Sequence, residues 1–112
     1  MPGHFELKAA KGGQFFFNLV ATNGQTILSS QMYKSKKTAK AGIASVQANC
    51  KDDTRYETKQ STNGKAFFVL KAKNHQVIGK SQMYESDAAC KGGIKSVKNN
   101  GDTAKLKDET AA

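Results

Sequence analysis

Four lysines gather where a helix is expected to begin, at Lys34, Lys36, Lys37 and Lys40. Free backbone N–H groups and the helix dipole make the start of a helix attractive to anions, so a phosphate or sulfate could dock there. Lysines that merely keep a helix end solvated give the same pattern, because exposed charges cost little. The equivalent stretch in the second half of the chain carries Glu85 and Asp87, which confines any such site to the first half.

Two phenylalanines, Phe16 and Phe67, occupy matching positions on a strand face that we expect to point away from the core. Lys8, Lys59 and Lys71 flank them on that face, and aromatic rings interleaved with lysines on an open sheet stack bases in several single-strand binders. Asn18, Glu6 and Glu57 interrupt this basic surface. Base stacking, contact with a protein and simple partial exposure therefore all stay open for the two rings.

The longest segment shared by the two halves is Ser-Gln-Met-Tyr, at residues 30–33 and 81–84. Its tyrosines, Tyr33 and Tyr84, are candidates for a binding edge. The segment also joins an expected strand to a helix cap, where Met and Tyr are suited to fix the path of the chain into the helix. The structural interpretation is the simpler one, since a turn that starts a helix has its own reasons to be repeated.

No group of residues has the spacing of a catalytic, metal or cofactor site. Cys50 and Cys90 stand where the other half carries a small residue, and their spacing from His4 and His75 matches no zinc site. A disulfide between them is disfavoured in a cytosolic protein. Neither histidine has an evident nucleophile or carboxylate partner. We therefore expect a protein that is not an enzyme and that uses no cofactor.

The chain of 112 residues has a net charge of +9, and Arg55 is the only arginine among its 18 basic residues. Lysine is a solvated point charge, whereas arginine matches phosphates and guanine edges, so sequence-specific DNA reading is disfavoured while weak polyanion binding is not. The N-terminus lacks the pattern of a signal peptide, and no apolar run approaches the ~20 residues of a membrane span. These features predict a cytoplasmic protein with no membrane partner.

The sequence is internally duplicated. Shifted by 51 positions, residues 5–51 align with residues 56–102 without a gap, and 21 of the 47 pairs are identical. Self-similarity at this level indicates one supersecondary unit used twice. A chain of this length supports a single core. We therefore predict one domain over residues 1–112, with a closing strand at 103–108 and a frayed tail at 109–112.

Each half shows three expected strands followed by a helix. Alternating apolar and polar residues mark strands at 5–9, 15–21 and 26–30 and again at 56–59, 66–72 and 77–81. The glycines at 12–13 and Asn63-Gly64 predict tight turns, and Asn23-Gly24 predicts a type I′ hairpin turn. The face that we assign to the core carries Phe15, Phe17, Leu19, Ala21, Ala66, Phe68, Leu70 and Ala72, with Ile27 and Ile78.

Ser35 and Ser86 predict the helix starts, since a serine oxygen caps free N–H groups. Apolar or small residues then recur at i, i+3, i+4 and i+7, which is typical of a helix with one buried face. Gly42 and Gly93 lie in mid-helix, where glycine costs ~1 kcal/mol relative to alanine, and this indicates a close approach of helix and sheet. Gly101 predicts a helix stop. The expected core anchors are Ile43, Val46, Ile94 and Val97.

Together these segments resemble the YegP-like family of small bacterial tandem-repeat proteins. The resemblance is carried by residues 15–21, 23–24, 30–36 and 42–46 and by their partners at 67–72, 81–86 and 93–97. It implies an α+β fold of two β3-α-β units that form one antiparallel sheet, with two helices on one face and the C-terminal strand exchanged between repeats. Single-unit members would have to dimerise to build this sheet. The resemblance therefore implies that this chain is a monomer whose two repeats correspond to the two subunits of such a dimer. The family is of uncharacterised function and implies no site residue.

These patterns favour a non-enzymatic module that binds a protein partner. Weak, non-specific binding of nucleic acid or another polyanion is the alternative, and a small-molecule enzyme is a second one, disfavoured because polar catalytic groups are not repeated in both halves. The candidate binding residues are Lys34, Lys36, Lys37, Lys40, Phe16, Phe67, Tyr33 and Tyr84.

If the lysine cluster binds polyanions, a Lys36→Glu, Lys37→Glu variant should elute earlier than the wild type from a nucleic-acid column. The physical reason is that each lost phosphate contact weakens binding and lowers its salt dependence. Elution is measured over a salt gradient. An unchanged elution position would remove the cluster from consideration.

Overall fold

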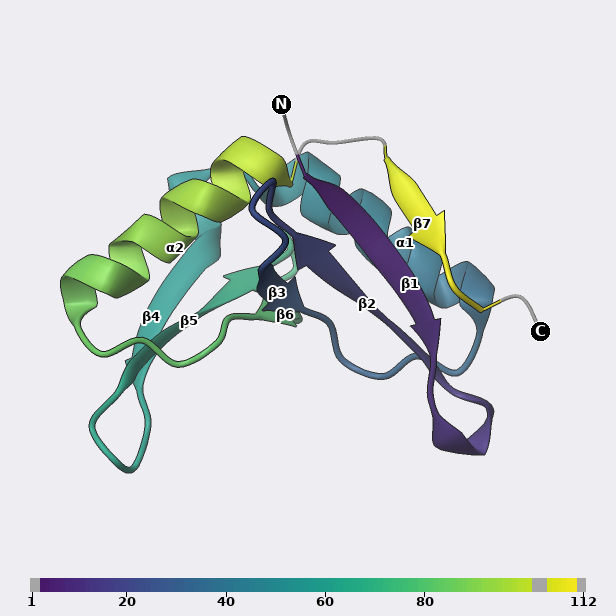
Figure 1. Cartoon of the computed structure of the whole chain (residues 1–112), viewed down its shortest axis with the longest axis horizontal. Coiled ribbons are helices and arrows are strands. Elements are labelled where there is room, and N and C mark those ends of the chain that lie inside the picture. The colour runs from purple at the N-terminus through teal and green to yellow at the C-terminus, as the bar shows by residue number, and fades with distance from the viewer. Residues whose placement is uncertain (1–2, 102–104, 111–112) are drawn as a thin grey trace.

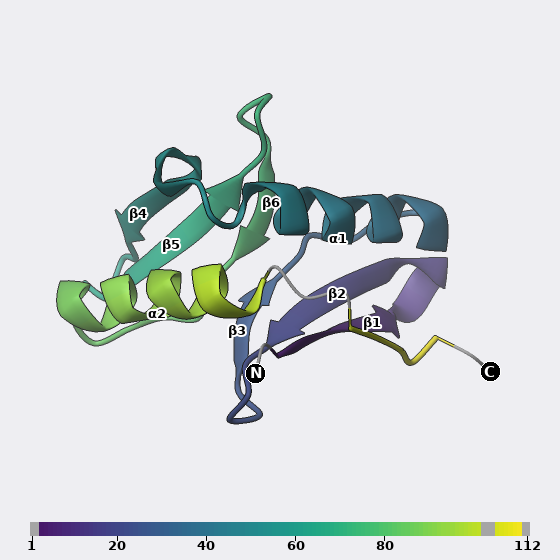
Figure 2. The same cartoon turned by 90° about the horizontal axis from the view of Figure 1, so that it is seen from above.

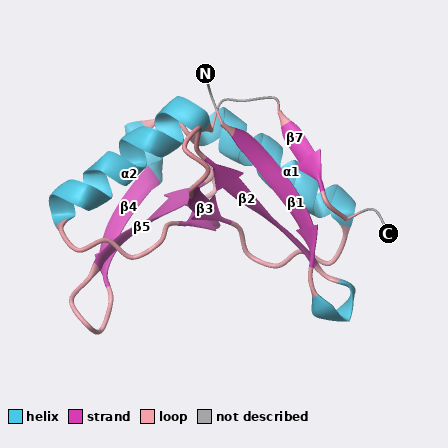
Figure 3. Ribbon diagram, in the orientation of Figure 1, coloured by secondary structure: helices cyan, strands magenta, loops and turns pink. Residues whose placement is uncertain are grey.

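The computed structural model describes residues 3–101 and 105–110, and these form one seven-stranded sheet with two long helices (Figure 1). Figure 3 shows the same elements by class. Two 3-10 turns, η1 (Lys11–Gly13) and η2 (Asp53–Arg55), lie between strands or between a helix and a strand. The strands and helices are β1 (His4–Ala9), β2 (Phe15–Val20), β3 (Thr26–Ser29), α1 (Lys36–Asn49), β4 (Tyr56–Gln60), β5 (Ala66–Lys71), β6 (Val77–Lys80), α2 (Asp87–Asn100) and β7 (Leu106–Asp108).

The two halves share one sheet, in which the strand order is β4-β5-β6-β3-β2-β1-β7. They meet at β3 and β6, which pair antiparallel with Ser29 opposite Lys80. The predicted repeat of three strands and a helix is therefore confirmed. Seen from above, α1 and α2 lie along the long axis of the molecule and are offset from each other (Figure 2).

The sheet is mixed, and the prediction of a purely antiparallel sheet was wrong on this point. β7 runs parallel to β1, with Leu106 opposite Phe5 and Asp108 opposite Leu7. Both strands begin near the C-terminal end of α2 and run in the same direction (Figure 1).

The exchange of C-terminal strands occurs in one direction only. β7 follows the second repeat and pairs with β1 of the first, whereas α1 leads through η2 directly into β4. Order also continues past the predicted strand end, because the Glu109 N–H donates to the Leu7 carbonyl oxygen over 2.8 Å. The backbone of Glu109 is thus hydrogen-bonded to β1. Residues 102–104 and 111–112, which contain the predicted start of the closing strand and the end of the tail, lie outside the described residues.

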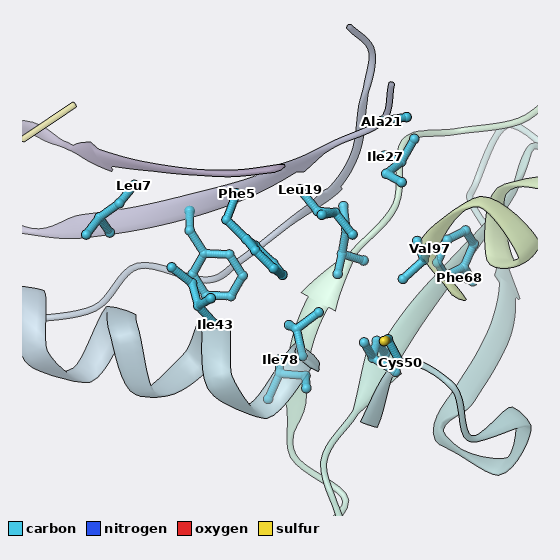
Figure 4. Close-up of a cluster of buried hydrophobic side chains, with 14 of the residues drawn as sticks. Phe5, Leu7, Leu19, Ala21, Ile27, Ile43, Cys50, Phe68, Ile78 and Val97 are labelled. Carbon is cyan, nitrogen blue, oxygen red and sulfur yellow. The ribbon is translucent and has the colours of Figure 1, made fainter. Parts of the chain in front are cut away.

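A single hydrophobic cluster lies between the sheet and the helices. The predicted core face is confirmed, since Phe17, Leu19, Phe68 and Leu70 are fully buried. Side chains from both halves converge in this cluster, as Phe5, Leu19, Phe68 and Val97 show (Figure 4). Burying a large apolar side chain contributes about 1.5–3 kcal/mol, so this shared cluster makes the two repeats one folding unit.

The hairpin turns have a different geometry from the predicted type I′. A type I′ turn needs positive φ at both central residues, but among the non-glycine residues described only His75 has positive φ, at 67°. In the β2–β3 hairpin the Gly24 N–H donates to the Ala21 carbonyl oxygen and Gly24 has φ of 84°. This is a type I turn followed by a left-handed residue. His75 takes that left-handed position in the second repeat and is exposed.

Both helices begin as predicted, because Ser35 Oγ accepts the Thr38 N–H and Ser86 Oγ accepts the Ala89 N–H. Gly101 does follow α2, but with φ of −74° it is no left-handed helix stop. Its small size has another cause. A Cβ at this position would lie 2.8 Å from the Val97 carbonyl oxygen and 3.0 Å from Cys50 Cβ.

The mid-helix glycines make room for aromatic rings. A Cβ at Gly93 would lie 3.0 Å from Phe68 Cε2 and would overlap the Tyr84 hydroxyl, and Gly42 has the same relation to Phe17 and Tyr33. The predicted close approach of helix and sheet is confirmed. The tyrosine hydroxyl that also fills this space comes from the segment preceding the helix, which sequence analysis did not anticipate.

Gly92 and Gly93 form a matched pair for testing this packing. Nothing lies within 4 Å of a Cβ at Gly92, so Gly92→Ala should raise the free energy of unfolding by roughly 0.5–1 kcal/mol through helix propensity. Gly93→Ala should lower it by about 1–3 kcal/mol through overpacking. Urea denaturation measures both values. Tyr84→Phe in the Gly93→Ala background should recover part of the loss, and equal effects of the two alanines would contradict this account.

Candidate functional site: an open strand edge

The predicted lysine cluster is partly occupied by the chain itself. Lys36 Nζ lies 2.5 Å from Asp108 Oδ2, which links α1 to β7. The hydrogen bond from Lys36 and those from Thr110 hold the pKa of Asp108 well below its usual range. Lys34, Lys37 and Lys40 are exposed. The structure thus brings Lys36 to a carboxylate of its own chain, and Lys37→Glu alone is the variant that leaves the β7 contact intact.

The sheet face with Phe16 and Phe67 carries paired rather than free charges. Both rings are half-buried, and Lys80 Nζ lies 4.9 Å from the centroid of the Phe67 ring. Lys8 contacts Glu109 over 3.1 Å, and Lys71 contacts Glu57 over 2.7 Å. These carboxylates offset the positive charge beside the two rings, so the face is less basic than its lysines alone indicate.

Tyr33 and Tyr84 are held by backbone hydrogen bonds and by ring stacking within their own repeats. The Tyr33 N–H and carbonyl oxygen bond to the Phe15 carbonyl oxygen and N–H over 2.7 and 2.8 Å. Its ring stacks on Phe17 with 6.1 Å between centroids, and burial raises the pKa of its hydroxyl. Tyr84 repeats these contacts on Ala66 and Phe68. The Met of the shared segment stays outside, since Met32 is 53% exposed.

The cysteines and histidines do not come together as a site. Cys50 and Cys90 are both buried, and burial raises the pKa of the Cys90 thiol, with a smaller effect from Asp87. Within residues 3–101 and 105–110, no three His, Cys, Asp or Glu side chains cluster as metal ligands would. No helix in those same ranges is long and apolar enough to cross a bilayer.

The two repeats differ most at their outer strands. β1 lies between β2 and β7, whereas β4 pairs with β5 and has no strand on its other side within the described part of the chain. Burial differs accordingly. Phe5 and Leu7 of β1 are fully buried, while the equivalent Tyr56 is half-buried and Thr58 is exposed. We call the outer side of β4 the β4 edge.

A groove runs between this edge and α2, and we call it the β4–α2 groove. It has a volume of about 320 Å³ and contains Thr58, Lys59, Gln60, Asp87, Cys90 and Lys91. The equivalent position in the first repeat is the place where α1, β1 and β7 meet. Its surface carries two lysines and one carboxylate, and the thiol of Cys90 lies at its base with 1% exposure.

The first repeat shows which backbone groups the β4 edge offers. In β1 the Phe5 N–H donates to the Lys105 carbonyl oxygen and the Leu7 carbonyl oxygen accepts from Glu109, so both residues direct their backbone groups toward β7. Their equivalents are Tyr56 and Thr58. The Tyr56 N–H already donates to the Asp53 carbonyl oxygen in η2. By this correspondence, Thr58 presents its N–H and carbonyl oxygen on the open side of β4.

The β4 edge has no direct signal in the sequence of β4. Its alternating charges, Glu57 and Lys59, indicate a strand but say nothing about its neighbours. A signal was available nonetheless, since a chain with two first strands and one closing strand leaves one first strand uncovered. The number of strands alone does not tell which first strand is uncovered. That follows only from the pairing of the closing strand with β1.

Comparison with known proteins agrees with the duplication. The model of a family described as Domain of unknown function (DUF1508) matches the chain twice, at residues 10–57 and 61–108. The fold and the repeat therefore define a tandem DUF1508 protein. The UPF0339 protein YegP of Yersinia pestis is 56% identical over 108 residues, which cover 96% of each chain. A UPF0339 protein of Acinetobacter baylyi is 54% identical over 110 residues, 98% of this chain and 99% of its own.

Two solved structures share the fold. The solution structure of YegP from Escherichia coli, titled a protein of unknown function, superimposes with a TM-score of 0.94 at 50% identity and covers 100% of this chain and 97% of its own. A UPF0339 protein from Shewanella oneidensis gives a TM-score of 0.92 at 49% identity, over 98% and 93% of the two chains. The chain belongs to the UPF0339 family, to which YegP belongs.

The ion pair between Lys36 and Asp108 predicts a pH dependence at β7. Because Asp108 has a depressed pKa when folded, its contribution to stability is present above its unfolded pKa of about 3.9 and is lost as pH falls through the folded value. Carboxyl NMR titration should therefore give Asp108 a pKa below 3.8. Lys36→Gln should raise that pKa toward 3.8, and Lys37→Gln should not. An unchanged pKa in Lys36→Gln would show that the ion pair is absent in solution.

Proposed function

We propose that this protein is a non-enzymatic interaction module that binds an extended segment of another polypeptide along the β4 edge. The observation that carries the proposal is the contrast between the repeats, since β7 covers β1 while the equivalent side of β4 has no strand in the described residues. An edge strand presents a row of N–H and carbonyl groups that template a further strand. The chain itself provides the example of such pairing in its first repeat.

The groove beside the edge supports the same function. Main-chain hydrogen bonds provide affinity in strand addition, and pockets for alternate side chains provide specificity. The β4–α2 groove supplies such a pocket on the helix side of β4. Two charged residues of β4, Glu57 and Lys59, lie 3.6 Å apart and have side chains that are both about half exposed, and Lys59 also lines the groove. Charged side chains of this kind also discourage unselective pairing, so a partner has to bring matching charges.

Polyanion binding has weaker support from the same charges. Lys8, Lys36 and Lys71 each contact a carboxylate in the described structure. Neutralised lysines contribute less to the release of counterions on which nucleic-acid affinity depends. Nucleic-acid binding would appear in the following test as recovery that nuclease treatment removes.

The test uses proline to block the β4 edge. Thr58→Pro removes the outward N–H, and proline is tolerated where a strand N–H faces solvent. Thr62→Pro is the matched control, because Thr62 is the second residue of the type I turn from Ser61 to Gly64, a position that favours proline. Affinity purification from nuclease-treated extract of the source cells should recover a protein partner with the wild type and Thr62→Pro. Recovery with Thr58→Pro should fall at least about tenfold, the effect of losing ~1.4 kcal/mol.

Two results would contradict the proposal. Equal recovery with both proline variants would place the partner elsewhere on the protein. Loss of all binding on nuclease treatment would favour the polyanion alternative. Circular dichroism and urea denaturation of the two variants check that β4 still pairs with β5 in Thr58→Pro.

A further inference from the structure

We infer that the β4 edge selects a strand, parallel to β4, that carries a basic side chain where β7 carries Asp108, and that it thereby rejects the chain's own C-terminal segment. This inference rests on the proposed function and names the chemistry of the partner. The occupant is an extended segment of another protein. Its side chains follow from the way the first repeat holds β7.

β7 is held on β1 by alternating contacts on its two faces. Leu106 and Asp108 stand opposite Phe5 and Leu7, which face the core. Asp108 thus points to the helix side, where it contacts Lys36 of α1. On the opposite face Glu109 contacts Lys8. The first repeat therefore binds a strand that carries an apolar residue, an acidic residue directed toward the helix and an acidic residue directed toward the open face of the sheet.

The second repeat keeps most of this arrangement and reverses one charge. The counterparts of Phe5, Leu7 and Lys8, 51 positions later, are Tyr56, Thr58 and Lys59. The counterpart of Lys36 is Asp87, which lines the β4–α2 groove together with Thr58 and Lys59. A strand on β4 would therefore place toward Asp87 the side chain that corresponds to Asp108. A lysine or arginine at that point is attracted, and an acid is repelled.

The charges at the groove are available for such a partner. No ion pair found among the described residues involves Asp87, whereas its counterpart Lys36 is paired. Among the described residues Lys59 contacts Glu57 and has no equivalent of the second carboxylate that Glu109 provides to Lys8. A partner strand with a basic residue toward Asp87 and an acidic residue toward Lys59 would satisfy both groups. The favoured pattern is thus apolar, variable, basic, acidic.

Asp87 also has a local role, because an acid in the first turn of α2 complements the helix dipole. That role does not explain why the first repeat tolerates Lys36 at the same helix position. The reversed charge has a further effect between molecules. If β7 of one copy could pair with β4 of the next, the contact would be head-to-tail and could propagate into a filament. Repulsion between Asp108 and Asp87 opposes that pairing.

The test compares two peptides on the full chain. One peptide has the sequence of residues 105–110, and the other carries Asp108→Lys. Binding is followed by NMR through the amide signals of Thr58, Lys59 and Lys91. The Asp108→Lys peptide should bind at these residues at least about fivefold more tightly than the native peptide, and 0.5 M salt should reduce this preference. Asp87→Lys should invert it and should fold, because α1 has lysine at the same position.

The outcomes separate this inference from the proposed function. Equal binding of both peptides at the β4 edge would overturn the charge selection while leaving strand addition intact. Binding of neither peptide, or a preference unchanged by Asp87→Lys, would also overturn it. Signals of β4 that shift with protein concentration alone would assign the edge to a second copy and refute the inference. Thr58→Pro is the control that abolishes every edge-dependent shift.

Discussion

The antiparallel contact between β3 and β6 is the interaction on which the rest of the structure depends. It joins two three-stranded halves into one sheet, and only a continuous sheet lets α1 and α2 share one hydrophobic cluster. Without it each half would expose Leu19 or Leu70 and the ends of its helix. A single repeat would bury a smaller fraction of its surface and would be only marginally stable, whereas the pair shares one hydrophobic core.

Joining two similar halves in one chain makes the two ends of the sheet different. Two first strands, β1 and β4, compete for a single closing strand, and β7 pairs with β1. The charge at the start of the helix differs between the repeats in the same way. Lys36 contacts Asp108 in the closed half, while Asp87 stands beside the open edge in the other. The repeats therefore remain alike where they build the core and differ where one of them has a neighbour.

Much of this fold was predictable because each signal occurs twice. The serine caps, the alternating strands and the mid-helix glycines are local patterns, and their repetition at 51 positions separates them from chance. What could not be predicted depends on contacts between distant segments. The parallel sense of β7 depends on its pairing with the distant strand β1, and the role of Lys36 depends on Asp108, far along the chain. The same holds for the candidate site. The predicted residues Tyr33 and Tyr84 have packing roles, and the β4 edge emerges only from the pairing of all the strands.

Cys50 and Gly101 stand at equivalent positions and lie against each other, with 3.0 Å between Cys50 Cβ and the place of a Cβ on Gly101. In an assembly of two identical single units, a residue on the symmetry axis meets its own copy. A larger side chain at that residue then adds its volume twice, once from each copy. Such a position is therefore restricted to very small side chains. Fusion of the units into one polypeptide lifts that restriction, because one copy can enlarge while the other stays minimal. The thiol of Cys50 thus occupies space that a symmetric ancestor would have had to divide equally between two subunits.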